Sequence, residues 1–174
     1  MPRGSSPHAR LAESAAKSFV LNKARLDTPE YLTDDLRGQR ACYVSMFAKP
    51  GNRLRAHAGH IMPTCQNLAE EIITHTCQGI STSSHALRRT DLNNLSYVVT
   101  VLSPMERIAV PAQLAPDTFG LHIISDTGKQ TTMLPGRPGI ESSDDQLTTA
   151  LREAGIDTTR DSYTMYRFSA ERYE

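Results

Sequence analysis

Several features that mark common protein classes are missing from this 174-residue chain. Lysine plus arginine and aspartate plus glutamate number 19 each, so no large net charge attracts nucleic acid or an anionic membrane. No run of about 18 apolar residues is present, and the segment MPRGSSPHAR lacks the apolar centre of a signal peptide. These absences predict a cytoplasmic protein that binds neither nucleic acid nor a membrane.

Motifs for common chemistry are also absent. The cysteines, Cys42, Cys65 and Cys77, form an odd set without C-x-x-C spacing, which predicts reduced thiols rather than a disulfide framework or a zinc knuckle. Glycine-rich phosphate loops, the G-x-S-x-G elbow and H-E-x-x-H do not occur. Common nucleotide-binding, serine hydrolase and zinc protease classes are therefore excluded, whereas less common enzyme classes stay open.

What the chain does contain is a series of short strands with fewer helices. Segments 41–48 and 53–61 flank the turn KPGN and predict a hairpin, with a helix over 67–77 after it. The remaining pattern predicts strands at 96–104, 117–125, 129–135 and 162–174 and helices at 9–26 and 142–155. It also predicts a mobile loop at 78–89 and a disordered tail at 1–8. In the second of these helices, Ser143 and Gln146 form a capping box and Gly155 the stop. Strands that follow one another through short turns predict an α+β fold, an antiparallel sheet with flanking helices.

Two stretches place a Leu-Arg pair near a glycine, Leu36–Gly38 and Leu54–Gly59. In the second, the period of a strand puts Arg55 and His57 on one face, opposite Leu54, Ala56 and Ala58. A histidine titrates near neutral pH and can act as an acid–base group, an arginine can hold an anionic substrate, and a glycine lets a ligand approach the backbone. On these residues alone, a catalytic strand face and a merely solvated one are equal alternatives.

A metal site formed by His57 and His60 is a weaker alternative. Residues three apart on a strand lie on opposite faces, so the two histidines would share a metal only if the chain turned at Gly59. Further ligands would come from Cys65, Glu70 or His85. The sequence specifies no cofactor.

The order of blocks along the chain resembles the AMMECR domain family, in particular its prokaryotic branch known as AmmeMemoRadiSam system protein A. Members carry a block like G-A-F-V-S-L, the signature L-R-G-C-I-G and then P-T-x-x-N-L-A-E-E-I-I, which here read ACYVSMF, LRAHAG and PTCQNLAEEII. The signature therefore maps to Leu54–Gly59 and not to Leu36–Gly38. Its cysteine is replaced by His57, and the family segment D-P-R-F is absent from QGISTSSHALRR at 78–89.

The resemblance implies one AMMECR-type domain over 9–174, with a larger and a smaller lobe and the signature at the cleft between them. It also implies a modification pathway shared with Memo-like and radical S-adenosylmethionine proteins, but no reaction. We expect Arg55, Gly59, His60 and Thr64 to bind a small anionic metabolite or cofactor fragment, with His57 and Arg55 as the candidate catalytic groups. An imidazole in place of a thiol can act as a base or hydrogen-bond donor. The alternative is a non-catalytic module that docks on such partners through residues 78–89 and a strand edge.

Overall fold

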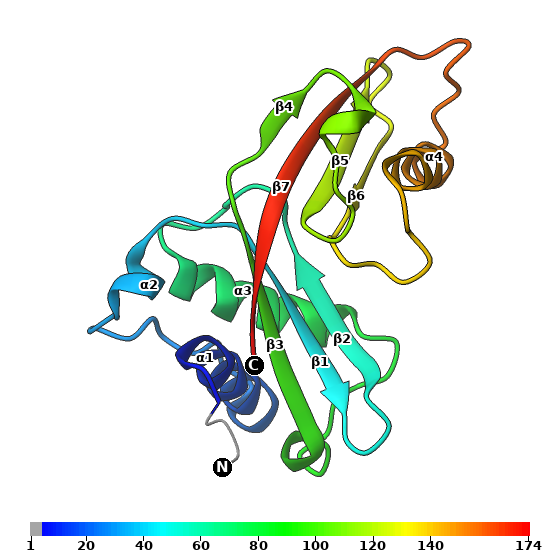
Figure 1. Ribbon diagram of the computed structural model, residues 1–174. Coiled ribbons are helices and arrows are strands. Elements are labelled where there is room, and N and C mark those ends of the chain that lie inside the picture. The colour runs from blue at the N-terminus through cyan, green and yellow to red at the C-terminus, as the bar shows by residue number, and fades with distance from the viewer. Residues whose placement is uncertain (1–4) are drawn as a thin grey trace. The chain divides into compact units, whose positions relative to one another are not determined.

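The computed structural model describes residues 5–174 and divides the chain into two compact units. The larger unit runs up to Val101 and includes Glu171–Glu174, and the smaller unit is Leu102–Ala170. Every strand pairing that the structure gives residue by residue is antiparallel. The predicted α+β class, with a larger and a smaller lobe, is confirmed (Figure 1).

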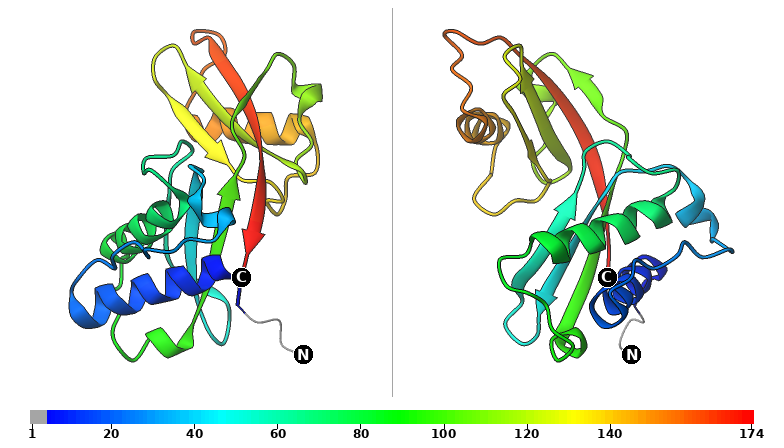
Figure 2. Two further views of the ribbon diagram at one scale, coloured as in Figure 1. Left: turned by 90° about the vertical axis from the view of Figure 1, so that its left-hand side faces the viewer. Right: turned by 180° about the vertical axis from the view of Figure 1, so that it is seen from behind.

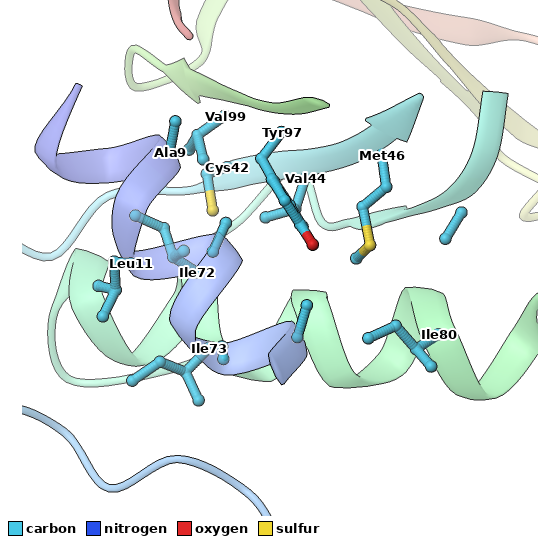
Figure 3. Close-up of a cluster of buried hydrophobic side chains, with 14 of the residues drawn as sticks. Ala9, Leu11, Cys42, Val44, Met46, Ile72, Ile73, Ile80, Tyr97 and Val99 are labelled. Atoms are coloured by element: carbon cyan, nitrogen blue, oxygen red, sulfur yellow. The ribbon is translucent and has the colours of Figure 1, made fainter. Parts of the chain in front are cut away.

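In the larger unit, three strands carry helices on one face (Figure 1). Its elements are α1 Pro7–Lys17, which continues as the π-helical turn η1 Ser18–Asn22, α2 Asp34–Arg37, β1 Cys42–Ala48, β2 Arg53–Gly59, α3 Leu68–Thr82, the short helix η2 Leu92–Asn94 and β3 Leu95–Leu102. The strand order is β2-β1-β3. Figure 3 shows the core that results, in which Cys42, Val44 and Met46 of β1 meet Ile72 and Ile80 of α3.

The first helix begins inside the segment predicted to be a disordered tail, residues 1–8. The Ser6 side chain accepts a hydrogen bond from the Ala9 amide, and Pro7 is the first helical residue, so Ser-Pro here is a helix start rather than a linker. His8 is buried and stacks on Tyr173 with ring centroids 3.8 Å apart. Residues 1–4 lie outside the described residues.

The helix after the hairpin is longer than the sequence suggests. Asn67 caps α3 by accepting from the Glu70 amide, and the helix continues to Thr82, so the irregular segment predicted at 78–89 begins only at Ser83. The Ser81 and Thr82 hydroxyls donate to carbonyls one turn earlier and so do not compete with the helix. The helix lies close to β2 at Gly79, where an added Cβ would be 3.4 Å from the strand backbone, at the edge of ordinary van der Waals contact.

A β-bulge changes the predicted alternation along β2. Met46 pairs with Ala56 but Phe47 pairs with Leu54, which leaves Arg55 as the extra residue on this strand. Ala56 and Ala58 are buried, whereas Leu54 is 52% exposed, contrary to the prediction that it shares a face with them. The bulge explains the difference, since it inverts the inward and outward positions before it.

The smaller unit is a second antiparallel arrangement with one α-helix and one short 3₁₀ helix among its described residues. It contains β4 Glu106–Ile108, the short helix η3 Pro111–Gln113, β5 Phe119–Ser125, β6 Gln130–Met133, α4 Ser143–Ala154 and, up to Ala170, the strand β7 Tyr163–Tyr173. The strand order is β4-β7-β5-β6. The stop at Gly155 is confirmed by its φ of 67°, but the N-cap is Ser142, which accepts from the Asp145 amide, and not Ser143. No helix within residues 5–174 is long and apolar enough to cross a bilayer.

Candidate functional site

His57 lies on the outward face of β2 with its ring held by two residues of β1. Its Nδ1 atom is 2.8 Å from the hydroxyl of Ser45, the residue opposite it in the ladder. The ring stacks on Tyr43, with centroids 5.3 Å apart and planes 9° from parallel. Although His57 remains exposed, the partial loss of water around it lowers its pKa, so the imidazole is neutral at pH 7. Because Nδ1 is engaged, Nε2 is the ring atom available to a ligand.

Gly59 makes room for the aromatic side of this arrangement. A Cβ at Gly59 would lie 2.3 Å from the Tyr43 ring and 2.6 Å from the Cys42 carbonyl oxygen. Tyr43 is the ladder partner of Gly59, so its ring crosses the strand where the side chain is missing. Gly59 thereby allows the contact between Tyr43 and His57. The approach of a ligand to its backbone stays a prediction.

Arg55, the bulged residue, keeps most of its hydrogen-bonding capacity. Its backbone carbonyl accepts a hydrogen bond from the Ser83 hydroxyl, with the two oxygen atoms 2.8 Å apart. Its guanidinium has one charged neighbour in the described structure, Asp91, with Nη2 3.9 Å from Oδ2, a distance too long for a hydrogen bond. Since a guanidinium has five N–H donors, those of Arg55 remain available for an anion.

His60 and Thr64, the other two predicted ligand residues, are engaged in the connection between β2 and α3. His60 Nδ1 accepts a hydrogen bond from the Met62 amide at 3.2 Å. The amide and hydroxyl of Thr64 both donate to the Glu71 carboxylate. No hydrogen bond or ion pair in the described structure joins either residue to Arg55 or His57. The structure therefore places two of the four predicted ligand residues, Arg55 and Gly59, together with His57 on β2.

Glu71 is the buried anchor of this connection. Its carboxylate, inaccessible to solvent, accepts from the Thr64 amide, the Thr64 hydroxyl and the Cys65 amide, the last at 2.7 Å. His75, one turn later on α3, places Nε2 2.7 Å from Oε2 of Glu71. Their spacing on a helix is typical of a surface pair, but both side chains are buried, and Glu71 contacts residues 64 and 65.

The cysteines and histidines do not gather into a metal centre. Within residues 5–174, no three His, Cys, Asp or Glu side chains are placed to share a metal ion, which gives the pair His57 and His60 no support as ligands. Cys42 is fully buried, and desolvation raises the pKa of its thiol well above the ordinary range. Burial also raises the pKa of Cys77, whereas Cys65 is partly exposed, with its sulfur 3.6 Å from the Thr74 hydroxyl.

These differences in burial predict an order of thiol reactivity. We expect a maleimide to modify Cys65 rapidly in the folded protein, and Cys42 and Cys77 only after unfolding, because the thiolate is the reactive form. Mass spectrometry of peptides from folded and urea-treated protein measures this order. Cys65→Ser should abolish the rapid phase, and rapid labelling of Cys42 in the folded protein would contradict the assignment.

Three residues of this region were not among the predicted site residues. Tyr43 and Ser45 alternate with Val44 in ACYVSMF, so the period of two could have placed them on the outward face of β1. Their contact with His57 depends on the hairpin register, which the bulge at Arg55 shifts. Asp91 lies in an irregular segment before η2 and has no sequence signal that would connect it with Arg55.

Comparisons with known proteins agree with this architecture. A model of the AMMECR1 family matches residues 9–173. A protein of Clostridium acetobutylicum is 30% identical over 172 residues, which cover 97% of this chain but only 36% of that relative. A protein of Thermotoga maritima is 25% identical over 173 residues, covering 98% of this chain and 99% of its own length. The crystal structure of the uncharacterized protein PH0010 from Pyrococcus horikoshii shares the fold, with a TM-score of 0.82, 20% identity and coverage of 95% of this chain and 88% of that one.

Proposed function

The chain belongs to the AMMECR1 family, and from this membership and the geometry of β2 we propose that it binds a small anionic metabolite or cofactor fragment beside Arg55 and His57. The observation that carries the proposal is the state of Arg55. Its side chain is only 16% exposed, yet its one charged neighbour in the described structure is 3.9 Å away. A largely buried guanidinium with free donors is suited to a carboxylate or phosphate.

His57 supplies the chemistry in this proposal. It is separated from Arg55 by one residue, Ala56, so in this proposal both side chains reach one small ligand, with the bulge at Arg55 setting the direction of the guanidinium. If the Ser45 hydroxyl donates to Nδ1, the proton of the neutral ring is on Nε2, which then donates to the anion. In the other tautomer, Nε2 accepts a proton and acts as a general base. The chain thus acts as an enzyme or accessory enzyme without the thiol of the family signature.

The pathway belongs to the same proposal. We assign the protein to a modification pathway with Memo-like and radical S-adenosylmethionine proteins, on the basis of its resemblance to the AmmeMemoRadiSam branch. The length of the Clostridium relative supports an association with other proteins or domains, because this chain spans about a third of it. A domain that occurs within a longer chain can act on a ligand that it shares with its neighbour.

A ligand screen tests the binding site directly. We expect at least one member of a panel of phosphorylated and carboxylated metabolites to raise the melting temperature. At a concentration 100-fold above its dissociation constant, the ligand should increase the free energy of unfolding by about 2.7 kcal/mol. Arg55→Ala and His57→Ala should each remove most of that shift. Differential scanning fluorimetry measures it, and calorimetry gives the affinity.

Arg53→Ala is the matched control, because Arg53 is an exposed arginine on the same strand with no ion pair in the described structure. It should leave the shift unchanged. The proposal fails if no panel member stabilises the wild type, or if the ligand stabilises the Arg55 and His57 variants as much as the wild type.

The second candidate function is a non-catalytic module that docks on the same partners. The exposed apolar side chains around β2 favour it, since Leu54 is 52% and Met62 is 50% exposed. If this function holds, the chain should co-purify with a Memo-like or radical S-adenosylmethionine partner equally well when Arg55 and His57 are both alanine. Loss of co-purification in that double variant would favour the ligand-binding function instead.

A further inference from the structure

The beginning of β3 forms a sheet edge that no other strand covers in the described residues. On one side β3 pairs with β1 from Leu95 onward. On the other side it neighbours β7, and the Ser103 amide donates to the Ser169 carbonyl at 2.9 Å. The two strands are antiparallel, so counting four residues back from Ser103 along β3 and four forward from Ser169 along β7 places Tyr173 opposite Val99. No strand among the described residues 5–174 pairs with Leu95–Val98 on that side, since the described part of β7 reaches only the level of Val99.

A groove with a volume of about 610 Å³ lies along this edge. Leu95–Val98 form one wall, and the others include Lys49 and Asn52 from the β1–β2 turn and Glu174 from the end of the chain. The side chains of Leu95 and Tyr97 belong to the hydrophobic core, and Figure 3 shows Tyr97 pointing into it. These two residues therefore meet the groove with their backbone rather than with their side chains.

The charges around the groove leave one cation unpaired within the described structure. Arg172 is paired with Glu174 and Glu13 with Lys17, both at 2.7 Å. The ammonium group of Lys49 has no hydrogen bond or ion pair to any described residue. Asn52 and Ser96 add neutral polar groups to the walls. The groove thus combines unpaired backbone with a single free positive charge.

We propose that this groove binds an extended acidic segment of a partner protein, which adds to the sheet as a strand beside β3. Its backbone would hydrogen-bond to the open edge at Leu95–Val98, and one of its carboxylates would contact Lys49. An open strand edge gives affinity through main-chain hydrogen bonds, and the side chains beside it give selectivity. Four residues of strand span about 13 Å, which is longer than most small metabolites and suits a peptide.

This surface is separate from the proposed ligand site in sequence and in chemistry. It uses β3 and the β1–β2 turn, whereas the ligand site uses Arg55 and His57 on β2. Failure of one proposal therefore leaves the other intact. The Arg55 and His57 variants should bind the peptide normally.

Amide NMR of the full chain tests the proposal with a short synthetic peptide of alternating glutamate and valine. We expect saturable shifts of the Leu95–Val98 amides and about tenfold weaker binding for Lys49→Glu. A glutamate–valine peptide with N-methylated backbone should bind at least tenfold more weakly, because it cannot donate to the edge. A lysine–valine peptide should not bind.

Lys23→Glu is the matched control, since Lys23 is an exposed lysine of the same unit that does not line the groove. It reverses the same charge and should leave binding unchanged. Absence of saturable binding, equal binding of the lysine peptide, or shifts outside β3 and its neighbours would overturn the proposal. A second copy of the chain is the other possible occupant of the groove, and sedimentation of the chain alone tests it. A dimer with protected β3 amides would mean that a second copy covers this edge, and this result would also overturn the proposal.

Discussion

Glu71→Ala is expected to lower the free energy of unfolding by about 3–5 kcal/mol, a large part of the stability of a typical domain. The substitution removes the acceptor of the Thr64 and Cys65 amides, which have no second acceptor in the described structure, and of the Thr64 hydroxyl, whose other neighbour is the Cys65 sulfur at 3.8 Å. It also leaves His75 buried beside a cavity without its carboxylate neighbour. A buried donor that loses its partner costs about 1–3 kcal/mol, so these losses accumulate.

Urea unfolding measured by circular dichroism gives this value. Glu70→Ala is the matched control, because Glu70 is the adjacent glutamate, is only partly buried and accepts one amide, that of Gln66. We expect it to cost less than about 1 kcal/mol. Equal effects of the two substitutions would show that Glu71 is not the anchor of the β2–α3 connection.

Gly59→Ala is the second substitution with a large expected effect, a loss of about 1–3 kcal/mol. The new methyl group would overlap the Tyr43 ring, and it would also stand 2.6 Å from the Cys42 carbonyl, a backbone atom that can move little. Displacement of Tyr43 would also disturb its stacking with His57, so the imidazole resonances of His57 should shift. Thermal unfolding and NMR of the histidine side chains measure the two consequences separately.

Gly38→Ala provides the control for this substitution, in the other stretch where Leu-Arg precedes a glycine. Gly38 has a φ of −65° and no atom within 4 Å of an added Cβ. Alanine should therefore be neutral there or stabilise by a few tenths of a kcal/mol through the unfolded chain. The assignment of structural importance to Gly59 fails if the two alanine variants are equally stable.

Much of the fold could be predicted because it depends on local patterns. The alternation in ACYVSMF and the stop at Gly155 specify a strand and a helix end within a few residues, and both appear in the structure. The local pattern places His8 in a tail, since its burial against Tyr173, which is distant in sequence, leaves no signal in the neighbouring residues. A local pattern cannot reveal a contact that only the completed fold creates.

Several features of the candidate site also could not be predicted from local patterns. The position of Arg55 and His57 on one strand could be predicted, but the bulge that makes Arg55 the extra residue depends on how β2 aligns with β1. The burial of Glu71 depends on its side of α3 facing residues 64 and 65, and His75 is buried beside it. Spacing alone describes these two residues as a surface pair. Register and helix orientation are properties of the packed structure, and they determine the surroundings of each of these side chains.

The path of β7 affects how the protein can fold as it is synthesised. This strand belongs to the smaller unit up to Ala170 and to the larger unit from Glu171. Its last residues lie beside the start of the first helix (Figure 2). There Tyr173 stacks on His8 and the Glu174 carbonyl accepts from the Ser6 amide. At typical rates of translation, residue 174 follows residue 8 by on the order of ten to thirty seconds. The contacts between the first helix and the end of β7 can therefore form only after the smaller unit has been synthesised.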